Sequence, residues 1–203
     1  MEEPDAQGQA TQSEPGPPEP IAIEDLKALI GTCKAGTAID DRDRAIFLVL
    51  LDTGVRAQEL CNTNLQDTDL NAGSAMIRHG KGGKSRTVFL GRKTRRALRS
   101  YLRQRRDRSP ALYVSARRDR LTYNGLRLML DDRAHLAKLE RKPTLHDFRR
   151  AFALNMLRNG VDIFALQRLM GHSDLQVMRR YLAQNIEDTQ MAHMRGSPVD
   201  NGL

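Results

Sequence analysis

The sequence predicts a mainly α-helical domain with one small antiparallel β-sheet, an α+β fold. Apolar residues recur at helical spacing through most of the chain after residue 20. One segment, residues 66–90, instead carries two short alternating runs around a glycine-rich turn. No internal repeat is visible, and 203 residues are enough for one hydrophobic core with tails.

Residues 1–20 are expected to form a disordered tail. Glu, Gln, Gly, Ser and Pro dominate this segment, which holds five acidic residues and no Lys or Arg. Because it has no apolar face, burial cannot offset the entropy that ordering would cost. The folded domain is therefore predicted over residues 21–185, followed by a C-terminal tail over residues 186–203.

The folded domain is predicted to begin with three helices. Ile23, Leu26 and Leu29 share one helix face, and a second helix is expected over about residues 41–53. Gly54 suits the end of that second helix, because glycine adopts the left-handed conformation common at helix C-termini. The third helix follows directly.

The alternating segment is predicted to form a β-hairpin with a basic tip. Residues 69–73 carry a turn signal, and residues 74–78 can form a short strand. Residues 81–84, Lys-Gly-Gly-Lys, form a tight turn, and residues 86–90 alternate as the returning strand does.

Five further helices complete the predicted fold. Thr122 is the expected N-cap of one of them. They span about residues 92–106 and 122–137, and then start from about Thr144, Asp162 and Asp174.

The charge indicates a polyanionic partner. The chain has 33 Lys and Arg, and once the five acids of the tail are set aside it has 20 Asp and Glu, a net charge of +13. Such an excess favours nucleic acid first and an anionic membrane second.

Other protein classes are excluded by simple features. Cys33 and Cys61 match no zinc or redox spacing, so reduced structural thiols are expected. The longest apolar run, residues 45–51, has seven residues, far short of the roughly 20 that span a bilayer. The N-terminus has neither the basic nor the apolar region of a secretory signal, so a cytoplasmic protein is expected.

Six polar residues in four segments are the candidate site. Tyr181 follows His172 by nine residues, and His146 and Arg149 are three apart on one helix face. Taken singly, each has an ordinary structural explanation, such as a solvated arginine or a half-buried tyrosine. In chain order they are Arg56, Lys81, His146, Arg149, His172 and Tyr181.

No nucleotide or metal cofactor is expected. Residues 83–85, Gly-Lys-Ser, resemble the end of a phosphate-binding loop, but the full motif needs a glycine where Arg78 stands and a helix where a strand is predicted. Asp67 and Asp69 are at best a weak pair of metal ligands.

The order of these motifs closely resembles the tyrosine recombinases, also called phage integrases. It runs Arg, hairpin Lys, His-x-x-Arg, Gly-His and a Tyr nine residues later, over roughly residues 21–185. The resemblance implies the tyrosine recombinase catalytic-core fold. It also implies an enzyme that cleaves and rejoins double-stranded DNA through a 3′-phosphotyrosyl intermediate.

The resemblance makes Tyr181 the nucleophile. A tyrosine hydroxyl has a reference pKa near 10 and needs a proton acceptor, which the resemblance assigns to His146. His172 donates a hydrogen bond to the phosphate, and Lys81 protonates the leaving 5′-oxygen.

Two arginines are implied to grip the phosphate. Arg56 and Arg149 correspond to the family's active-site arginines, whose forked guanidiniums suit the non-bridging oxygens of a phosphodiester. Glu59, one helical turn from Arg56, is implied to support it.

Residues 92–108 hold nine Arg or Lys in seventeen positions. Part of this segment is expected to contact the DNA backbone, although a solvated helix face is the plainer alternative. The predicted DNA contacts are Lys84, Arg86, Arg92, Lys93, Arg95, Arg96 and Arg99.

The sequence departs from the family pattern in two ways. Arg150 and Ala151 stand where relatives more often carry His or Thr, which we expect to affect packing or a DNA contact. Nothing resembles the family's N-terminal helical DNA-clamping domain, so the chain is either a fragment or grips DNA less extensively. The resemblance further implies a monomer in solution, a tetrameric synapse on DNA, and a C-terminal piece that docks on a neighbouring subunit.

Two other functions stay open from the sequence. A type IB topoisomerase-like enzyme would share the chemistry without exchanging strands, and a non-catalytic DNA-binding protein could share the fold. The spacing of His172 and Tyr181 favours the recombinase over the first, and all six polar residues together argue against the second.

Overall fold

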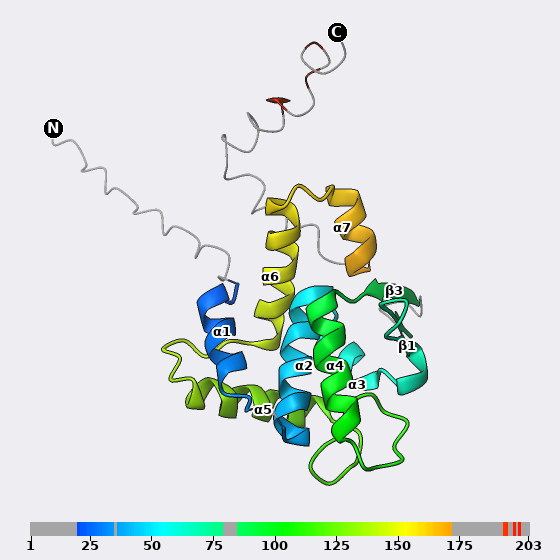
Figure 1. Ribbon diagram of the computed structural model, residues 1–203. Coiled ribbons are helices and arrows are strands. Elements are labelled where there is room, and N and C mark those ends of the chain that lie inside the picture. Colours follow the sequence, from blue (N-terminus) through cyan, green and yellow to red (C-terminus); the bar gives the residue numbers. More distant parts are fainter. Residues whose placement is uncertain are drawn as a thin grey trace, which may run out of the picture.

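A computed structural model describes residues 20–34, 36–78 and 85–171, with residues 193, 194, 197 and 199. The predicted fold, mainly α with one small antiparallel sheet, is confirmed (Figure 1). The helix predicted from Asp174 and both tails fall largely outside the described residues. The helices are α1 (Ile23–Gly31), α2 (Ala38–Thr53), α3 (Ala57–Asn62), α4 (Arg92–Gln104), α5 (Tyr123–Leu136), α6 (Leu145–Arg158) and α7 (Ile163–Met170), with a short 3-10 helix at Leu65–Asp67.

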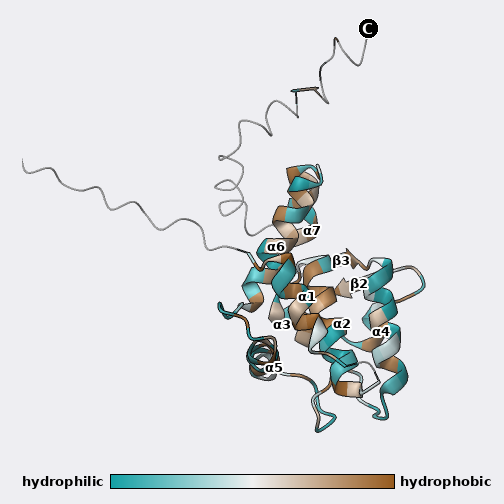
Figure 2. Cartoon of the chain, turned by 60° about the vertical axis from the view of Figure 1, so that its left-hand side comes forward, coloured by the Kyte–Doolittle hydropathy of each residue, from teal (hydrophilic) through white to brown (hydrophobic). Residues whose placement is uncertain are grey.

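Helix α2 is the centre of the domain and packs against both α4 and α6. The rings of Phe47 on α2 and Phe148 on α6 stack with centroids 5.8 Å apart, and both side chains are fully buried. Figure 2 shows the hydrophilic outer side of α4, which is the face turned away from this core. The α2 helix begins at Ala38, earlier than predicted, because the Thr37 hydroxyl accepts a hydrogen bond from Asp40 N at 3.1 Å.

The sheet has the order β1-β2-β3, with β1 (Thr68–Asp69), β2 (Ser74–Ile77) and β3 (Arg86–Phe89). The predicted hairpin is confirmed as β2 and β3, in antiparallel register with Ile77 opposite Arg86. The two-residue strand β1 was not predicted, because alternation cannot be recognised over so short a run. The hairpin tip, residues 79–84, lies outside the described residues.

Both cysteines are buried and unpaired, as expected of structural thiols. Burial raises the pKa of Cys33 and of Cys61 to about 11, so both thiols stay protonated at neutral pH. Within the described residues, none of the helices has the length and apolar character needed to cross a bilayer.

Gly54 ends α2 in a place where no other residue fits. Its φ is +59°, in the left-handed region that glycine tolerates best. A Cβ added there would lie 2.3 Å from Cδ1 of Phe152 on α6. The close approach of α2 and α6 at this point therefore depends on the missing side chain.

We expect Gly54→Ala to destabilise the fold by about 3 kcal/mol, from the positive φ and the clash with Phe152 together. The measurement is urea unfolding followed by circular dichroism. Gly31→Ala is the matched control, since Gly31 is helical with open space around its Cα, and alanine there should be neutral or stabilising by up to about 1 kcal/mol. Equal unfolding midpoints for the two variants would contradict this account.

Candidate active site

Helix α6 carries the predicted His-x-x-Arg pair. Its first turn is capped by Asp147, whose Oδ2 accepts a hydrogen bond from Thr144 N at 2.7 Å. Arg149 is only 2% exposed. Its Nη1 donates to the Gly54 carbonyl, and its Nη2 donates to the Met170 carbonyl at 2.9 Å. His146, one turn earlier, is exposed. Arg149 thus joins the end of α2 to the end of α7.

Arg56 lies just beyond Gly54, at the start of α3. Its backbone N donates to Glu59 Oε2 at 2.9 Å, and its Nη1 donates to Glu59 Oε1 at 3.2 Å. The Arg56 side chain is 28% exposed, whereas that of Glu59 is 8% exposed. Glu59 is therefore a buried acceptor beside a partly exposed guanidinium.

Arg86 is mostly buried and makes its hydrogen bonds within the protein. Its side chain is only 11% exposed. Its Nη1 and Nη2 donate to the two carboxylate oxygens of Glu59 at 2.8 and 2.7 Å, and its Nε donates to the Leu169 carbonyl at 3.1 Å. The prediction that Arg86 contacts DNA is at odds with this geometry. The sequence did contain a signal, because Arg86 shares a strand face with the buried Val88.

The Glu59 carboxyl is held ionised. Burial raises its pKa, but the hydrogen bonds from Arg86 and from the Arg56 backbone, with the charges of both guanidiniums, outweigh burial and lower the pKa to about 2. Because this value lies below the ordinary 4.5, Glu59 stabilises the fold at pH values above 4.5. That contribution is lost as the pH falls from 4.5 toward about 2.

We expect Glu59→Gln to destabilise the fold by roughly 2 kcal/mol at pH 7, because two arginines lose a charged acceptor. The difference from the unaltered chain should shrink as the pH falls below 4.5, where the native carboxyl also begins to lose its advantage. Chemical denaturation at pH 7, 5 and 3.5 measures this difference. A gap between the two proteins that stays constant with pH would contradict the lowered pKa.

The C-terminal end of α7 is fixed by two arginines. Arg86 binds the carbonyl of Leu169, and Arg149 binds that of Met170. These are carbonyls of the last turn, which lack partners within the helix. Gly171 then adopts a φ of +73°, and a Cβ there would lie 3.3 Å from Cδ and Nη1 of Arg86. Gly171, the last described residue before His172, thereby packs against Arg86.

Four predicted functional residues lie outside the described residues: Lys81, Lys84, His172 and Tyr181. Their roles stay predictions. The described part of the site is the junction of Gly54, the start of α3, the start of β3 and the end of α7, with Arg149 of α6 among them. Figure 1 shows α7 beside α6 and next to β3 at one end of the domain.

Arg150 and Ala151, which depart from the family pattern, both make contacts within the protein. Arg150 Nη1 donates to Asp147 Oδ1 at 2.9 Å, so it forms an ion pair within α6. Ala151 is 1% exposed and belongs to the core. Ala151 therefore contributes to packing, whereas Arg150 contributes an ion pair.

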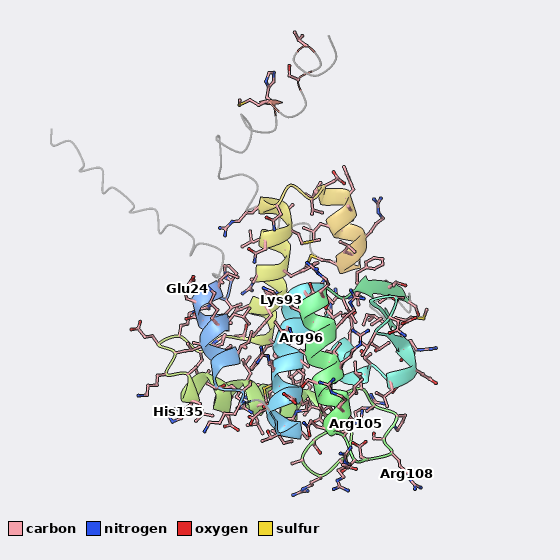
Figure 3. All side chains as sticks on the ribbon, in the orientation of Figure 1. Glu24, Lys93, Arg96, Arg105, Arg108 and His135 are labelled. Atoms are coloured by element: carbon pink, nitrogen blue, oxygen red, sulfur yellow. The ribbon has the colours of Figure 1, made fainter. Side chains whose placement is uncertain are left out.

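The basic residues of α4 that were predicted to contact DNA fall into two groups. Arg95 Nη1 donates to the Asn71 carbonyl at 3.1 Å, and Arg99 Nη2 donates to the Leu70 carbonyl at 2.7 Å, so both help to hold the β1–β2 turn. Arg92, Lys93 and Arg96 are exposed. Figure 3 shows Lys93 and Arg96 on the half of α4 nearer to α7.

A second basic surface joins the end of the basic segment 92–108 to residues 117–120, which were not singled out from the sequence. An open groove between residues 106–109 and 117–120 is lined largely by arginines. Arg106, Arg108, Arg117 and Arg118 are all exposed there. It lies beyond the C-terminal end of α4, where Figure 3 labels Arg108.

Among the described residues, no group of three or more His, Cys, Asp or Glu could hold a metal ion. Asp67, one of the two weak metal-ligand candidates, instead pairs with Arg78 at 2.5 Å. Asp69 Oδ1 accepts hydrogen bonds from Asn71 N and Ala72 N at 2.8 and 2.9 Å, so it shapes the following turn.

Comparison with known proteins places these motifs in a family. The sequence profile of the phage integrase family matches residues 21–188. The chain is 33% identical over 187 residues to tyrosine recombinase XerA of Pyrococcus furiosus, covering 91% of this chain and 64% of that protein. It is 33% identical to tyrosine recombinase XerC of Myxococcus xanthus, covering 89% and 63%.

Solved structures show the same fold. The crystal structure of XerA recombinase matches with a TM-score of 0.74 and 32% identity, over 90% of this chain and 66% of that one. XerH recombinase, bound to its palindromic difH substrate in a post-cleavage complex, matches in fold with a TM-score of 0.70 and 24% identity, over 87% and 52%. The chain thus spans less than two thirds of the curated relatives it matches. From the family profile and the motifs together, the chain belongs to the phage integrase family.

Proposed function

We propose that this chain is the catalytic part of a site-specific DNA recombinase. It cleaves and rejoins DNA strands through a 3′-phosphotyrosyl intermediate at Tyr181. One observation carries the proposal: Arg56 and Arg149 come from separate helices to a single junction, which leads directly into His172. The relatives' names, tyrosine recombinases XerA and XerC, support the same reaction.

The arrangement suits a phosphodiester whose non-bridging oxygens gain negative charge. Arg149 is held by two backbone carbonyls, and Arg56 is held by the ionised Glu59. Guanidiniums fixed in advance stabilise a transition state without reorganisation during the reaction. Each guanidinium has five N–H donors, more than the two that Arg149 uses for these carbonyls.

The proton transfers fall to residues around this junction. His146, exposed on α6, accepts the proton of the Tyr181 hydroxyl as it attacks phosphorus. Lys81 gives a proton to the departing 5′-oxygen, and His172 donates a hydrogen bond to the phosphate. One phosphoester bond forms as another breaks, so the reaction can be reversed to rejoin the strands without a nucleotide cofactor.

We further propose that the protein is a monomer in free solution and works on DNA in the cytoplasm as an assembly of four copies. A solved structure of similar fold, that of XerH, contains the recombinase bound to its difH substrate. The C-terminal residues 186–203 would then dock on a neighbouring copy. Deleting them should weaken assembly on DNA while leaving the fold of residues 21–171 intact.

The direct test is a covalent adduct. The chain is incubated with nicked duplex DNA, so that the cleaved strand diffuses away, and the product is run on a denaturing gel. A protein–DNA adduct that also forms in excess chelator supports tyrosine chemistry without a metal. Cleavage without an adduct, restored by magnesium, would identify a metal-dependent nuclease instead.

Two alternatives are separated by further assays. A non-catalytic DNA-binding protein would bind the duplex but give no adduct. A type IB topoisomerase-like enzyme would give the adduct and relax supercoiled DNA, yet fail to exchange strands between two duplexes. Strand exchange is the expected result for this chain.

The DNA backbone is proposed to contact the exposed residues Arg92, Lys93 and Arg96. The start of α4 lies close to the site, because Gly91 N donates to Asp52 Oδ2 at 2.6 Å, two residues before Gly54. The arginine groove lies roughly 20 Å farther along, given the 13 residues of α4 and a rise of about 1.5 Å per residue.

Salt dependence tests this interface. Replacing both Lys93 and Arg96 with Gln should reduce the slope of log affinity against log salt by about two, as expected when two phosphate contacts are lost. The double change of Arg117 and Arg118 to Gln, in the groove, is the matched comparison. If only the groove variant lowers the slope, the DNA follows the groove and the α4 face is solvated.

A further inference from the structure

The Arg86 guanidinium connects three elements of the site. It projects from the first residue of β3, on the same strand face as Val88, and only 11% of its side chain is exposed. Two of its nitrogens bind Glu59 on α3, and the third binds the Leu169 carbonyl in the last turn of α7. A guanidinium can make all three bonds at once because its donors form a planar fork.

Glu59 is shared between two arginines. Its Oε1 accepts from Nη1 of Arg86 at 2.8 Å and from Nη1 of Arg56 at 3.2 Å. Its Oε2 accepts from Nη2 of Arg86 at 2.7 Å and from the backbone N of Arg56 at 2.9 Å. An ionised carboxylate offers about four acceptor sites, so these bonds saturate it. The shorter, two-pronged pair belongs to Arg86, and the longer side-chain bond belongs to Arg56.

The same fork fixes the exit of α7. Gly171 packs against Arg86, with room for a hydrogen but not comfortably for a methyl group, since an added Cβ would lie 3.3 Å from two Arg86 atoms. The next residue along the chain is His172. Arg86 therefore contacts the support of one active-site arginine and the segment that leads to the second active-site histidine.

We propose that Arg86 is a positioning residue for strand cleavage, which sets Arg56 through Glu59 and sets the approach to His172 through the end of α7. This inference rests on the proposed recombinase function. Without Arg86, the buried Glu59 would keep a single arginine partner, and Arg56 would be drawn toward the carboxylate and away from the phosphate. The carbonyl of Leu169 would lose its donor at the same time.

The test compares Arg86→Met and Arg86→Lys with Arg78→Met. Arg78 directly follows β2, on the other arm of the hairpin, and pairs with Asp67. Arg78→Met therefore also removes an arginine–carboxylate ion pair from the hairpin, but not one that involves Glu59. Single-turnover cleavage of nicked DNA is measured at saturating protein, and the Kd for uncleaved DNA is measured separately. The pKa of Glu59 is followed by carbon NMR.

For Arg86→Met we expect cleavage to slow by about a hundredfold while Kd changes by less than about threefold, because misplaced groups lose rate rather than binding. Arg86→Lys should remain at least about tenfold slow, since an ammonium cannot span both Glu59 oxygens and a carbonyl. Arg78→Met should cleave within about threefold of the unaltered chain. The pKa of Glu59 should rise from about 2 in Arg86→Met and stay there in Arg78→Met.

Several results would overturn the proposal. Normal cleavage by Arg86→Met, or full recovery in Arg86→Lys, would show that the three-way link is unnecessary. A drop in affinity equal to the drop in rate would make Arg86 a DNA contact. The proposed function fails separately, if the unaltered chain forms no adduct. In that case the NMR measurement still tests whether Arg86 binds Glu59. An unchanged pKa of Glu59 in Arg86→Met would refute that contact.

Discussion

Tyr181→Phe is expected to abolish the covalent DNA adduct while leaving DNA affinity within about twofold of the unaltered chain, because only the attacking hydroxyl is removed. Phenylalanine keeps the aromatic ring and differs only by the hydroxyl, so folding should be unaffected. The measurement pairs a denaturing gel for the adduct with fluorescence anisotropy for binding. Complete loss is expected, since phenylalanine has no hydroxyl that could form the phosphoester bond.

The structure limits which other tyrosines could act as the nucleophile. The chain has four tyrosines. Tyr101 and Tyr113 are each 1% exposed, with rings stacked 6.2 Å apart, and burial raises the pKa of both. Tyr123, at the start of α5, is 45% exposed. Tyr123→Phe is therefore the control, and an adduct that persists in Tyr181→Phe but disappears in Tyr123→Phe would move the nucleophile to α5.

The fold was largely predictable because its elements follow simple periodicities. Arg86–Phe89 alternates between buried and exposed positions, and the capped helices α5 and α6 begin where Thr122 and Thr144 predicted. The features that the sequence did not predict were either very short, such as the two-residue strand β1, or set by a helix cap. The early start of α2 depends on the Thr37 hydroxyl, which the apolar pattern does not reveal.

The sequence indicated a set of candidate site residues but not the contacts that the described ones make. Arg86 follows a basic hairpin tip, so it was grouped with the DNA contacts. Its true partner, Glu59, lies 27 residues away in the sequence. Arg95 and Arg99 were grouped likewise, although their partners at residues 70 and 71 include backbone carbonyls, which every residue possesses. Composition can show that a cation is present but cannot show which buried acceptor folding brings to it.

Arg149→Lys is expected to slow strand cleavage by about a thousandfold, although the positive charge is kept. The Arg149 fork reaches the carbonyls of Gly54 and Met170 at once, and a lysine ammonium is a single point that cannot reproduce this geometry. One carbonyl would lose its donor in the buried site, which should also lower the stability of the fold by about 1–3 kcal/mol. Single-turnover cleavage is therefore measured at a temperature where circular dichroism shows the variant fully folded.

The neighbouring Arg150→Lys separates this effect from a general loss of charge on α6. Arg150 pairs with Asp147 through one nitrogen, a bond that lysine can replace, so cleavage should stay within about threefold of the unaltered chain. Comparing the cleavage rates of Arg149→Lys and Arg150→Lys separates the effect of losing the forked guanidinium from the effect of charge. If Arg149→Lys instead cleaves within about tenfold of the unaltered chain, the residue acts as a simple cation. The two carbonyl contacts would then serve the packing of α2 and α7 rather than the chemistry.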